Sequence, residues 1–276
     1  MTTPEFDLEA DDIVDLSDQI AEALERSDAD DLNTLMDSVT ISEALRELLS
    51  LSTADQDKLI SLISAEIASE LIDEAPPELA GMLIERQETA KAVEIFDELD
   101  SNVQADVLAE LDEEDADAIL AGIDPVDAAS VRRLAEYDAG TAGGLMVADA
   151  FTFRPNQTVG AVLRSLASDD EDLERYDGQH PYIIDEDDRP LGVVSLRGLL
   201  TAKRSARLDD IMITPMTVNA SASLDELQDL FNDHAFLGFP VVDDGGVLVG
   251  VVSRTDVDAA ILERSEADNM RLQGIV

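Results

Sequence analysis

The side chains in this sequence that could do chemistry are mostly carboxylates. It has 63 Asp and Glu residues, two His residues and no Cys. Carboxylate oxygens are the ligands that hard divalent cations prefer, whereas the lack of Cys excludes thiolate nucleophiles, disulfides and Cys-containing zinc sites. His180 and His234 are too few and too far apart in the sequence for a convincing catalytic triad or His-rich metal site. The residues favour cation binding, and we expect no enzymatic activity.

The densest group of carboxylates lies at residues 112–117, which read DEEDAD. Asp112 and Asp115 are candidate metal ligands in this group. The alternative is a solvated start of a helix, because acidic side chains stabilise the first turn through the helix dipole. Both interpretations stay open at this point.

The net charge sets limits on binding partners. With 18 Lys and Arg residues against the 63 acids, the formal net charge is -45 at pH 7. Such a surface repels nucleic-acid phosphates and anionic lipid headgroups, and with 4% aromatic residues and no Trp the chain has little material for stacking on bases. We therefore expect no nucleic-acid partner. Acid-rich, Lys-poor surfaces also suit life at high salt, so part of this charge could be an adaptation of that kind.

The N-terminal residues and the apolar runs of the sequence predict no signal peptide and no membrane-spanning segment. The first residues, MTTPEFD, lack the basic and apolar regions of a signal peptide, and the longest apolar runs, such as residues 247–252, fall far short of the roughly 20 residues that span a bilayer. We expect a cytoplasmic chain that does not itself enter a membrane.

The secondary structure that must position these carboxylates is predicted to be helical in the N-terminal half of the chain. A chain of 276 residues is long enough for two or three domains. Residues 1–40 are highly acidic, and Ile13, Leu16, Ile20 and Leu24 have the spacing of one amphipathic helix after a flexible start. Residues 41–136 favour helix almost throughout, with short breaks at 52–53, 76–77, 100, 112 and 124–125.

A repeat of twelve residues runs through this helical region. One register holds Ile84, Phe96, Leu108 and Leu120, and the neighbouring register holds Leu83, Ile95, Val107, Ile119 and Val131. Asp100, Asp112 and Asp124 recur at the same interval before helical stretches, where an Asp side chain can accept the unpaired N–H groups of the first turn. The pattern predicts a superhelix of short α-helices, each packing a narrow apolar stripe on its neighbours.

The pattern changes after Tyr137, where glycines and β-branched runs appear. Residues 182–185 (YIID) are echoed by 240–243 (PVVD), and residues 191–195 (LGVVS) by 249–253 (VGVVS). Each copy reads as strand, helix, strand, strand, helix. We place the copies at residues 137–207 and 208–262, and predict an α/β tandem pair that packs face to face.

The second copy resembles a CBS domain in the sequence GVVSRTD at residues 250–256, whereas the first copy has GVVSLRG at 192–198, with Gly198 in place of the final Asp. The resemblance implies that Ser253 faces the phosphates of an adenine nucleotide and that Asp256 binds its ribose. By the same resemblance His180, at the start of a strand, could stack on the adenine, and Arg197 is a further candidate for nucleotide binding.

The order of helical repeat, the sequence TAGGLM at residues 141–146 and paired CBS copies resembles the N-terminal and CBS regions of the MgtE magnesium transporters over residues 41–276. Residues 263–276 resemble the start of the helix that connects to the pore. The resemblance implies a homodimer through the CBS domains, and Mg²⁺ bound between the parts, which compacts them and closes the pore. By position in the family, Asp256, Glu266 and Asp268 are expected metal ligands.

Two functions follow from this resemblance. The first is a Mg²⁺-sensing regulatory region at the inner face of the membrane, acting on a transmembrane pore domain in cis or in trans. The alternative is a stand-alone CBS module that binds an adenine nucleotide and regulates a partner protein, since Ser253 and Asp256 are intact.

Overall fold

The computed structural model describes residues 16–167 and 179–273, except the side chains of 266–268, 270, 272 and 273 in the last helix. The expected flexible start, including Ile13, lies outside the described residues. The chain forms two compact units. The first contains residues up to 99 together with 110–123, and the second contains residues 100–109 together with those from 124 onward.

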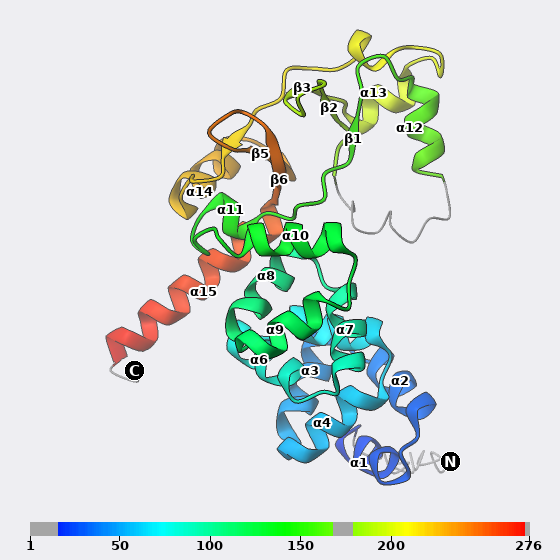
Figure 1. Ribbon diagram of the computed structural model, residues 1–276, viewed down its shortest axis with the longest axis vertical. Coiled ribbons are helices and arrows are strands. Elements are labelled where there is room, and N and C mark those ends of the chain that lie inside the picture. The colour runs from blue at the N-terminus through cyan, green and yellow to red at the C-terminus, as the bar shows by residue number, and fades with distance from the viewer. Residues whose placement is uncertain (1–15, 168–178, 274–276) are drawn as a thin grey trace, which may run out of the picture. The chain divides into compact units, whose positions relative to one another are not determined.

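The described part of the first unit consists of short helices joined by short turns (Figure 1). They are α1 (Leu16–Arg26), α2 (Ala29–Asp37), α3 (Ile41–Ser50), α4 (Thr53–Leu62), α5 (Ala65–Asp73), α6 (Pro77–Glu85), α7 (Thr89–Glu98) and α9 (Glu113–Leu120). Of the two apolar registers, all members are buried except Leu108, which is half-buried. The twelve-residue repeat therefore predicted the core of the helical region correctly.

Polar side chains cap helices at two of the breaks that the sequence predicted. Asp112 accepts hydrogen bonds from the backbone N–H groups of Glu114 and Asp115, both at 3.0 Å, and so caps α9. Asp124 accepts one from Val126 at 2.7 Å. Each cap satisfies donors that the first helical turn leaves unpaired.

Residues 16–37 differ from the expected single helix. They form α1 and α2, because Ser27 adopts a left-handed backbone with a φ of 53° and ends the first helix. Asp28 then caps the second helix by accepting a hydrogen bond from Asp31 N at 3.2 Å. Apolar spacing alone does not reveal such a break, because the apolar residues before and after it recur at the same interval.

The second unit contains the paired copies. Before them come α8 (Ser101–Glu110), α10 (Pro125–Leu134) and α11 (Ala142–Leu145). The first copy consists of β1 (Thr152–Phe153), α12 (Val159–Ser165), β2 (Tyr182–Ile184), β3 (Pro190–Val193) and α13 (Leu196–Thr201). The second follows a 3₁₀ turn (Leu208–Asp210) with β4 (Val218–Asn219), α14 (Leu224–Asp233), β5 (Gly238–Val242), β6 (Leu248–Ser253) and α15 (Arg254–Gln273). The predicted order of strand, helix, strand, strand, helix is confirmed in both copies.

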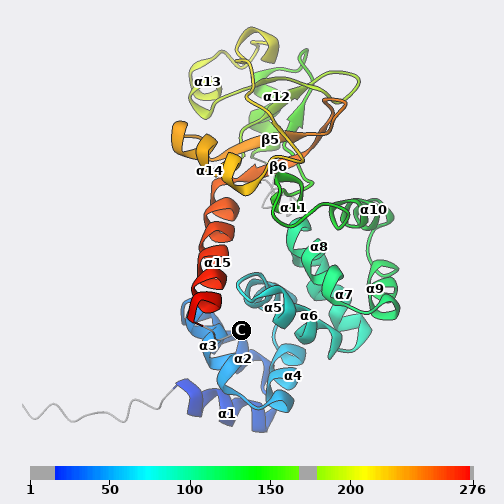
Figure 2. The same cartoon turned by 90° about the vertical axis from the view of Figure 1, so that its left-hand side faces the viewer.

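Each copy has a three-stranded sheet in which the first pair of strands is parallel and the second antiparallel, in the orders β1-β2-β3 and β4-β5-β6. Figure 2 shows α15 as one long helix continuing directly from β6. The motif that ends β6 therefore lies where a strand becomes a helix.

The two copies exchange the segments that precede their first strands. Val147, ahead of β1 in the first copy, pairs with Val251 of the second through two hydrogen bonds of 2.9 Å. Ile213, ahead of β4 in the second copy, pairs with Val193 of the first at 2.9 and 3.0 Å. Each sheet is thus completed by chain from the other half of the repeat, so we expect the copies to fold as one cooperative body.

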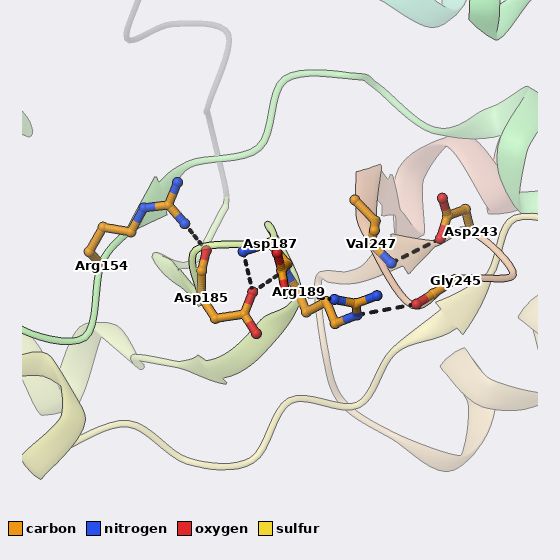
Figure 3. Close-up of polar contacts among 7 residues, drawn as sticks. All are labelled: Arg154, Asp185, Asp187, Arg189, Asp243, Gly245 and Val247. Carbon is orange, nitrogen blue, oxygen red and sulfur yellow. Dashed lines mark hydrogen bonds and ion pairs between the residues drawn. The ribbon is translucent and has the colours of Figure 1, made fainter.

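The two hairpin turns also meet (Figure 3). The Arg189 side chain donates a hydrogen bond to the carbonyl of Gly245 at 3.2 Å. Within each turn an Asp holds the backbone: Asp185 accepts from Arg189 N, and Asp243 accepts from Val247 N, both at 2.9 Å. Asp243 thus shapes its turn as Asp185 does in the first copy.

The exchanged segments give a test of the fold. A Cβ atom at Gly250 would lie 2.4 Å from the carbonyl oxygen of Val147 and 2.8 Å from the sulfur of Met146. Because the backbone must move, we expect Gly250→Ala to lower the free energy of unfolding by about 1–3 kcal/mol. Thermal unfolding followed by circular dichroism measures it. Gly140→Ala is the control, since its Cβ would meet nothing closer than an Asp138 oxygen at 3.7 Å; equal midpoints for both variants would contradict the close approach.

Candidate functional site

A group of three carboxylates lies in the first unit. Glu85 ends α6, Asp112 caps α9 and Asp115 lies in the first turn of α9. One carboxylate oxygen from each of these three residues lies within 4.8 Å of the others. Asp112 and Asp115 were predicted from their spacing, whereas Glu85 was not, because 27 positions separate it from Asp112 in the sequence.

This geometry suits a hard divalent cation. Mg²⁺ takes oxygen ligands and keeps several of its waters, so a few carboxylates that converge on one point are enough to hold it. Glu85 and Asp112 are exposed and Asp115 is half-buried, which leaves room for bound water. Like charges so close together repel one another, and a cation bound among these three groups would remove that repulsion.

A second acidic contact lies in the second unit, at the start of α15. Burial raises the pKa of Asp256, the Ser253 hydroxyl lowers it by donating a hydrogen bond of 2.6 Å, and the Asp100 carboxylate raises it again. The shift as a whole is upward. The sequence indicated Asp100 only as a helix start, because 156 positions separate it from Asp256.

The start of α8 is held in place beside this contact. The hydroxyl of Ser101 accepts a hydrogen bond from the backbone N–H of Ala148 at 2.7 Å. Ser101 and Gln104 are buried polar residues, and the Asn102 side-chain oxygen is buried without a hydrogen-bond partner among the described residues. A run of polar groups is therefore buried along the helix that brings Asp100 to Asp256.

A cavity of about 600 Å³ lies between the two copies. Its wall includes His180, Tyr182, Phe236 and Ser253. Burial raises the pKa of Tyr182, so its hydroxyl stays neutral at physiological pH. Two of the four proposed nucleotide-binding residues, His180 and Ser253, thus lie in one cavity.

The other proposed site residues lie elsewhere. Arg197 is exposed on α13 and does not line the cavity, and neither does Asp256, whose carboxylate is held by Ser253. Glu266 and Asp268 belong to α15, but their side chains lie outside the described residues. Gly198 gives its backbone N–H to Ser195 at 3.1 Å, just as Asp256 N does to Ser253 at 3.1 Å, so the two motifs share a backbone turn and differ in the side chain.

Comparison with known proteins assigns both units. Residues 36–140 match the family model of the MgtE intracellular N domain, and residues 142–205 and 208–263 each match that of the CBS domain. The magnesium transporter MgtE of Thermus thermophilus is 36% identical over 149 residues, which are 54% of this chain and 32% of that protein. The chain belongs to the MgtE family.

Solved structures identify the matching part of MgtE. The cytosolic domain of the Mg²⁺ channel MgtE in complex with ATP is 29% identical, with a TM-score of 0.78, and the match covers 88% of this chain and 99% of that one. The soluble part of a magnesium transporter has the same fold, with a TM-score of 0.75 at 23% identity, covering 91% of this chain and 99% of the other. The chain thus corresponds, over most of its length, to the cytosolic domain of MgtE.

The match to the Thermus transporter spans about a third of that protein's length. Among the described residues of this MgtE-type chain, no helix is both long and apolar enough to cross a membrane.

The raised pKa of Asp256 gives a second test. A carboxyl whose pKa is higher in the folded state favours folding when protonated, and that contribution is lost as pH rises through the folded-state pKa. We therefore expect Asp256→Asn, which can still accept the Ser253 hydrogen bond, to raise the thermal midpoint by a few degrees at neutral pH without divalent cations. The gain should vanish below the pKa of an unfolded Asp, about 3.9.

Thermal midpoints from pH 3 to 8 measure this effect. Asp258→Asn is the matched control, because Asp258 is exposed on the same helix. A variant Asp256→Asn that is less stable than the parent protein at neutral pH would show that the ionised carboxylate stabilises this turn.

Proposed function

We propose that this chain is the Mg²⁺-sensing regulatory region of an MgtE-like magnesium transporter, and that bound divalent cations compact it. The observation that carries the proposal is the convergence of Glu85, Asp112 and Asp115, whose oxygens lie within 4.8 Å of one another. Membership of a family whose named relatives are magnesium transporters supports Mg²⁺ as the ion.

The charge of the chain supplies the mechanism. With a formal net charge of -45, acidic surfaces repel one another, and self-repulsion opposes the compact state. A divalent cation between carboxylates reverses the sign of that interaction. The pKa of Asp256 is raised mainly by burial and further by the Asp100 carboxylate, and this second cause supports a repulsion of this kind within the second unit. Asp256, Glu266 and Asp268 are proposed as further ligands.

The proposed partners are a second copy of the chain and a transmembrane pore domain, in cis or in trans. Leu196 and Leu200 are exposed one turn apart on α13, and Leu262 is exposed on α15. Large apolar side chains on neighbouring turns are typical of a face that another protein covers. These exposed leucines support dimerisation through the CBS domains. In such a dimer, compaction of the regulatory region would act on the pore domain.

Small-angle X-ray scattering tests the sensing proposal. We expect the radius of gyration to fall as Mg²⁺ rises to millimolar levels with monovalent salt held constant, because bound ions remove carboxylate repulsion. Replacing the triad by Glu85→Gln, Asp112→Asn and Asp115→Asn should move the midpoint to several-fold higher Mg²⁺. Asn keeps the helix cap at position 112.

The matched control is the triple variant Glu98→Gln, Glu113→Gln and Glu114→Gln, which removes three exposed carboxylates outside the triad. Its midpoint should stay near that of the parent protein. No change in radius up to millimolar Mg²⁺ would reject the sensing proposal. An equal shift in both variants would assign the response to net charge and not to the triad.

A second function has an observation of its own. The cavity lined by His180 and Ser253 supports binding of an adenine nucleotide, and the similar cytosolic domain of MgtE was solved in complex with ATP. Isothermal titration calorimetry tests it, with Phe236→Ala expected to weaken binding because Phe236 lines the cavity. The absence of binding heat with ATP, AMP and adenosine would reject this function and leave the Mg²⁺ proposal untouched.

A further inference from the structure

The helix α12 and the turn that follows α13 come from two stretches of sequence without acidic side chains. Residues 150–168 and 189–208 contain no Asp or Glu, although the whole chain has 63 of them. The stretches lie side by side: Val159 N donates a hydrogen bond to the carbonyl oxygen of Ala206 at 3.0 Å, and Gly160 N donates one to that of Arg204 at 2.8 Å. Positive charge brought together here therefore has no acidic neighbour within either stretch.

Three cations meet where α12 packs on this turn. Arg164 lies on α12, whereas Lys203 and Arg204 lie in the turn, and all three residues are exposed. A Cβ atom built on Gly160 would lie 3.5 Å from the Cβ atom of Arg204 and 3.6 Å from Nη1 of Arg164, so both side chains flank the same glycine. A hydrogen bond of 2.8 Å from Ala206 N to the Lys203 carbonyl closes the turn and holds the backbone of Lys203 beside them.

The side chains of these three cations have no partner among the residues that the structure describes. None of them forms an ion pair or a hydrogen bond there, whereas Arg207, in the same stretch, pairs with Asp209 at 2.6 Å. The chain as a whole has 63 acidic residues for its 18 basic ones, so an unpaired group of cations stands apart from the rest of the surface. Because like charges repel one another, an anion bound among the three would remove that repulsion.

The group is separate from the cavity between the copies, because none of the three cations lines that cavity. The backbone N–H groups of Val159 and Gly160, at the start of α12, are already bonded to the turn, so the side chains are left to bind an anion. An Arg guanidinium presents its N–H donors in a planar fork that matches two phosphate oxygens, and a Lys ammonium adds a point charge. Two forks and one ammonium therefore suit an anion with several separate oxygens.

We propose that Arg164, Lys203 and Arg204 form a binding site for a phosphate group. This site is independent of the Mg²⁺ and nucleotide proposals above. The charge of the rest of the chain opposes binding only weakly, because at 0.1 M salt the Debye length is about 10 Å and more distant carboxylates are screened. Since the three side chains are exposed, affinity falls as salt rises. A free phosphate and the headgroup of an anionic lipid offer the same chemistry to this site.

Equilibrium dialysis of the whole chain against radiolabelled inorganic phosphate tests the site. It is done without divalent cations, at the lowest salt at which circular dichroism shows a folded chain. We expect one phosphate per chain. The triple variant Arg164→Gln, Lys203→Gln and Arg204→Gln should weaken binding at least about tenfold, because the charge-assisted hydrogen bonds to the phosphate oxygens are lost.

The matched control is the triple variant Arg26→Gln, Arg46→Gln and Arg133→Gln, which removes three exposed Arg side chains outside the two acid-free stretches. Its phosphate affinity should stay near that of the parent protein. An equal loss of affinity in both triple variants would assign binding to net charge and would overturn the proposal.

Arg164→Gln alone tests whether α12 and the turn act together. We expect phosphate to bind several-fold more weakly while the thermal midpoint stays unchanged, because the exposed Arg164 side chain has no partner within the described part of the chain. An unchanged affinity would show that the turn alone attracts the anion and would overturn the three-residue site.

Sedimentation with vesicles distinguishes the two sources of phosphate, with vesicles of phosphatidylcholine and phosphatidylglycerol compared with phosphatidylcholine alone. Leu166, two residues after Arg164, is 45% exposed and would contact the apolar part of a lipid. Binding to the anionic vesicles that is lost in the Arg164, Lys203 and Arg204 variant and weakened by Leu166→Ser assigns a lipid headgroup. Phosphate binding without vesicle binding assigns the free anion. A parent protein that binds neither probe would overturn the proposal.

Discussion

Repulsion between carboxylates is the constraint on which the rest of this structure depends. A chain with 63 acidic and 18 basic residues cannot pair most of its negative charges within itself. Many of the acids serve locally, as Asp112 and Asp124 do by capping helices. Others are brought toward like charges, as at Glu85 and Asp115 or at Asp100 and Asp256. Such contacts are the places where a bound cation would remove repulsion between carboxylates.

The helical unit and the paired copies resist this repulsion in different ways. In the first, short helices bury an apolar stripe at a constant interval, so stability is spread along the chain. In the second, each sheet is completed by a segment from the other half of the repeat, as Val147 pairs with Val251 and Ile213 with Val193. Because each sheet includes a segment from the other copy, the shape of the cavity between the copies depends on the packing of both.

Local features of the fold were predictable from the sequence, and contacts between distant segments were not. Helix starts at Asp112 and Asp124 follow from capping chemistry within four residues, and the core registers follow from apolar period. The partner of Asp256 could not be read in this way, because nothing in a helix start indicates which distant helix it will face. Glu85 was missed in the candidate site for the same reason.

One turn of helix joins the two proposed functions. The hydroxyl of Ser253 belongs to the wall of the cavity and donates a 2.6 Å hydrogen bond to Asp256, whose pKa responds to Asp100. A ligand that draws this hydroxyl into the cavity would take from the ionised carboxylate the hydrogen bond that stabilises it. By linkage, the factor by which a cation bound at Asp256 would alter ligand affinity equals the factor by which the ligand would alter cation affinity. We therefore expect a titration with one of them to depend on the concentration of the other.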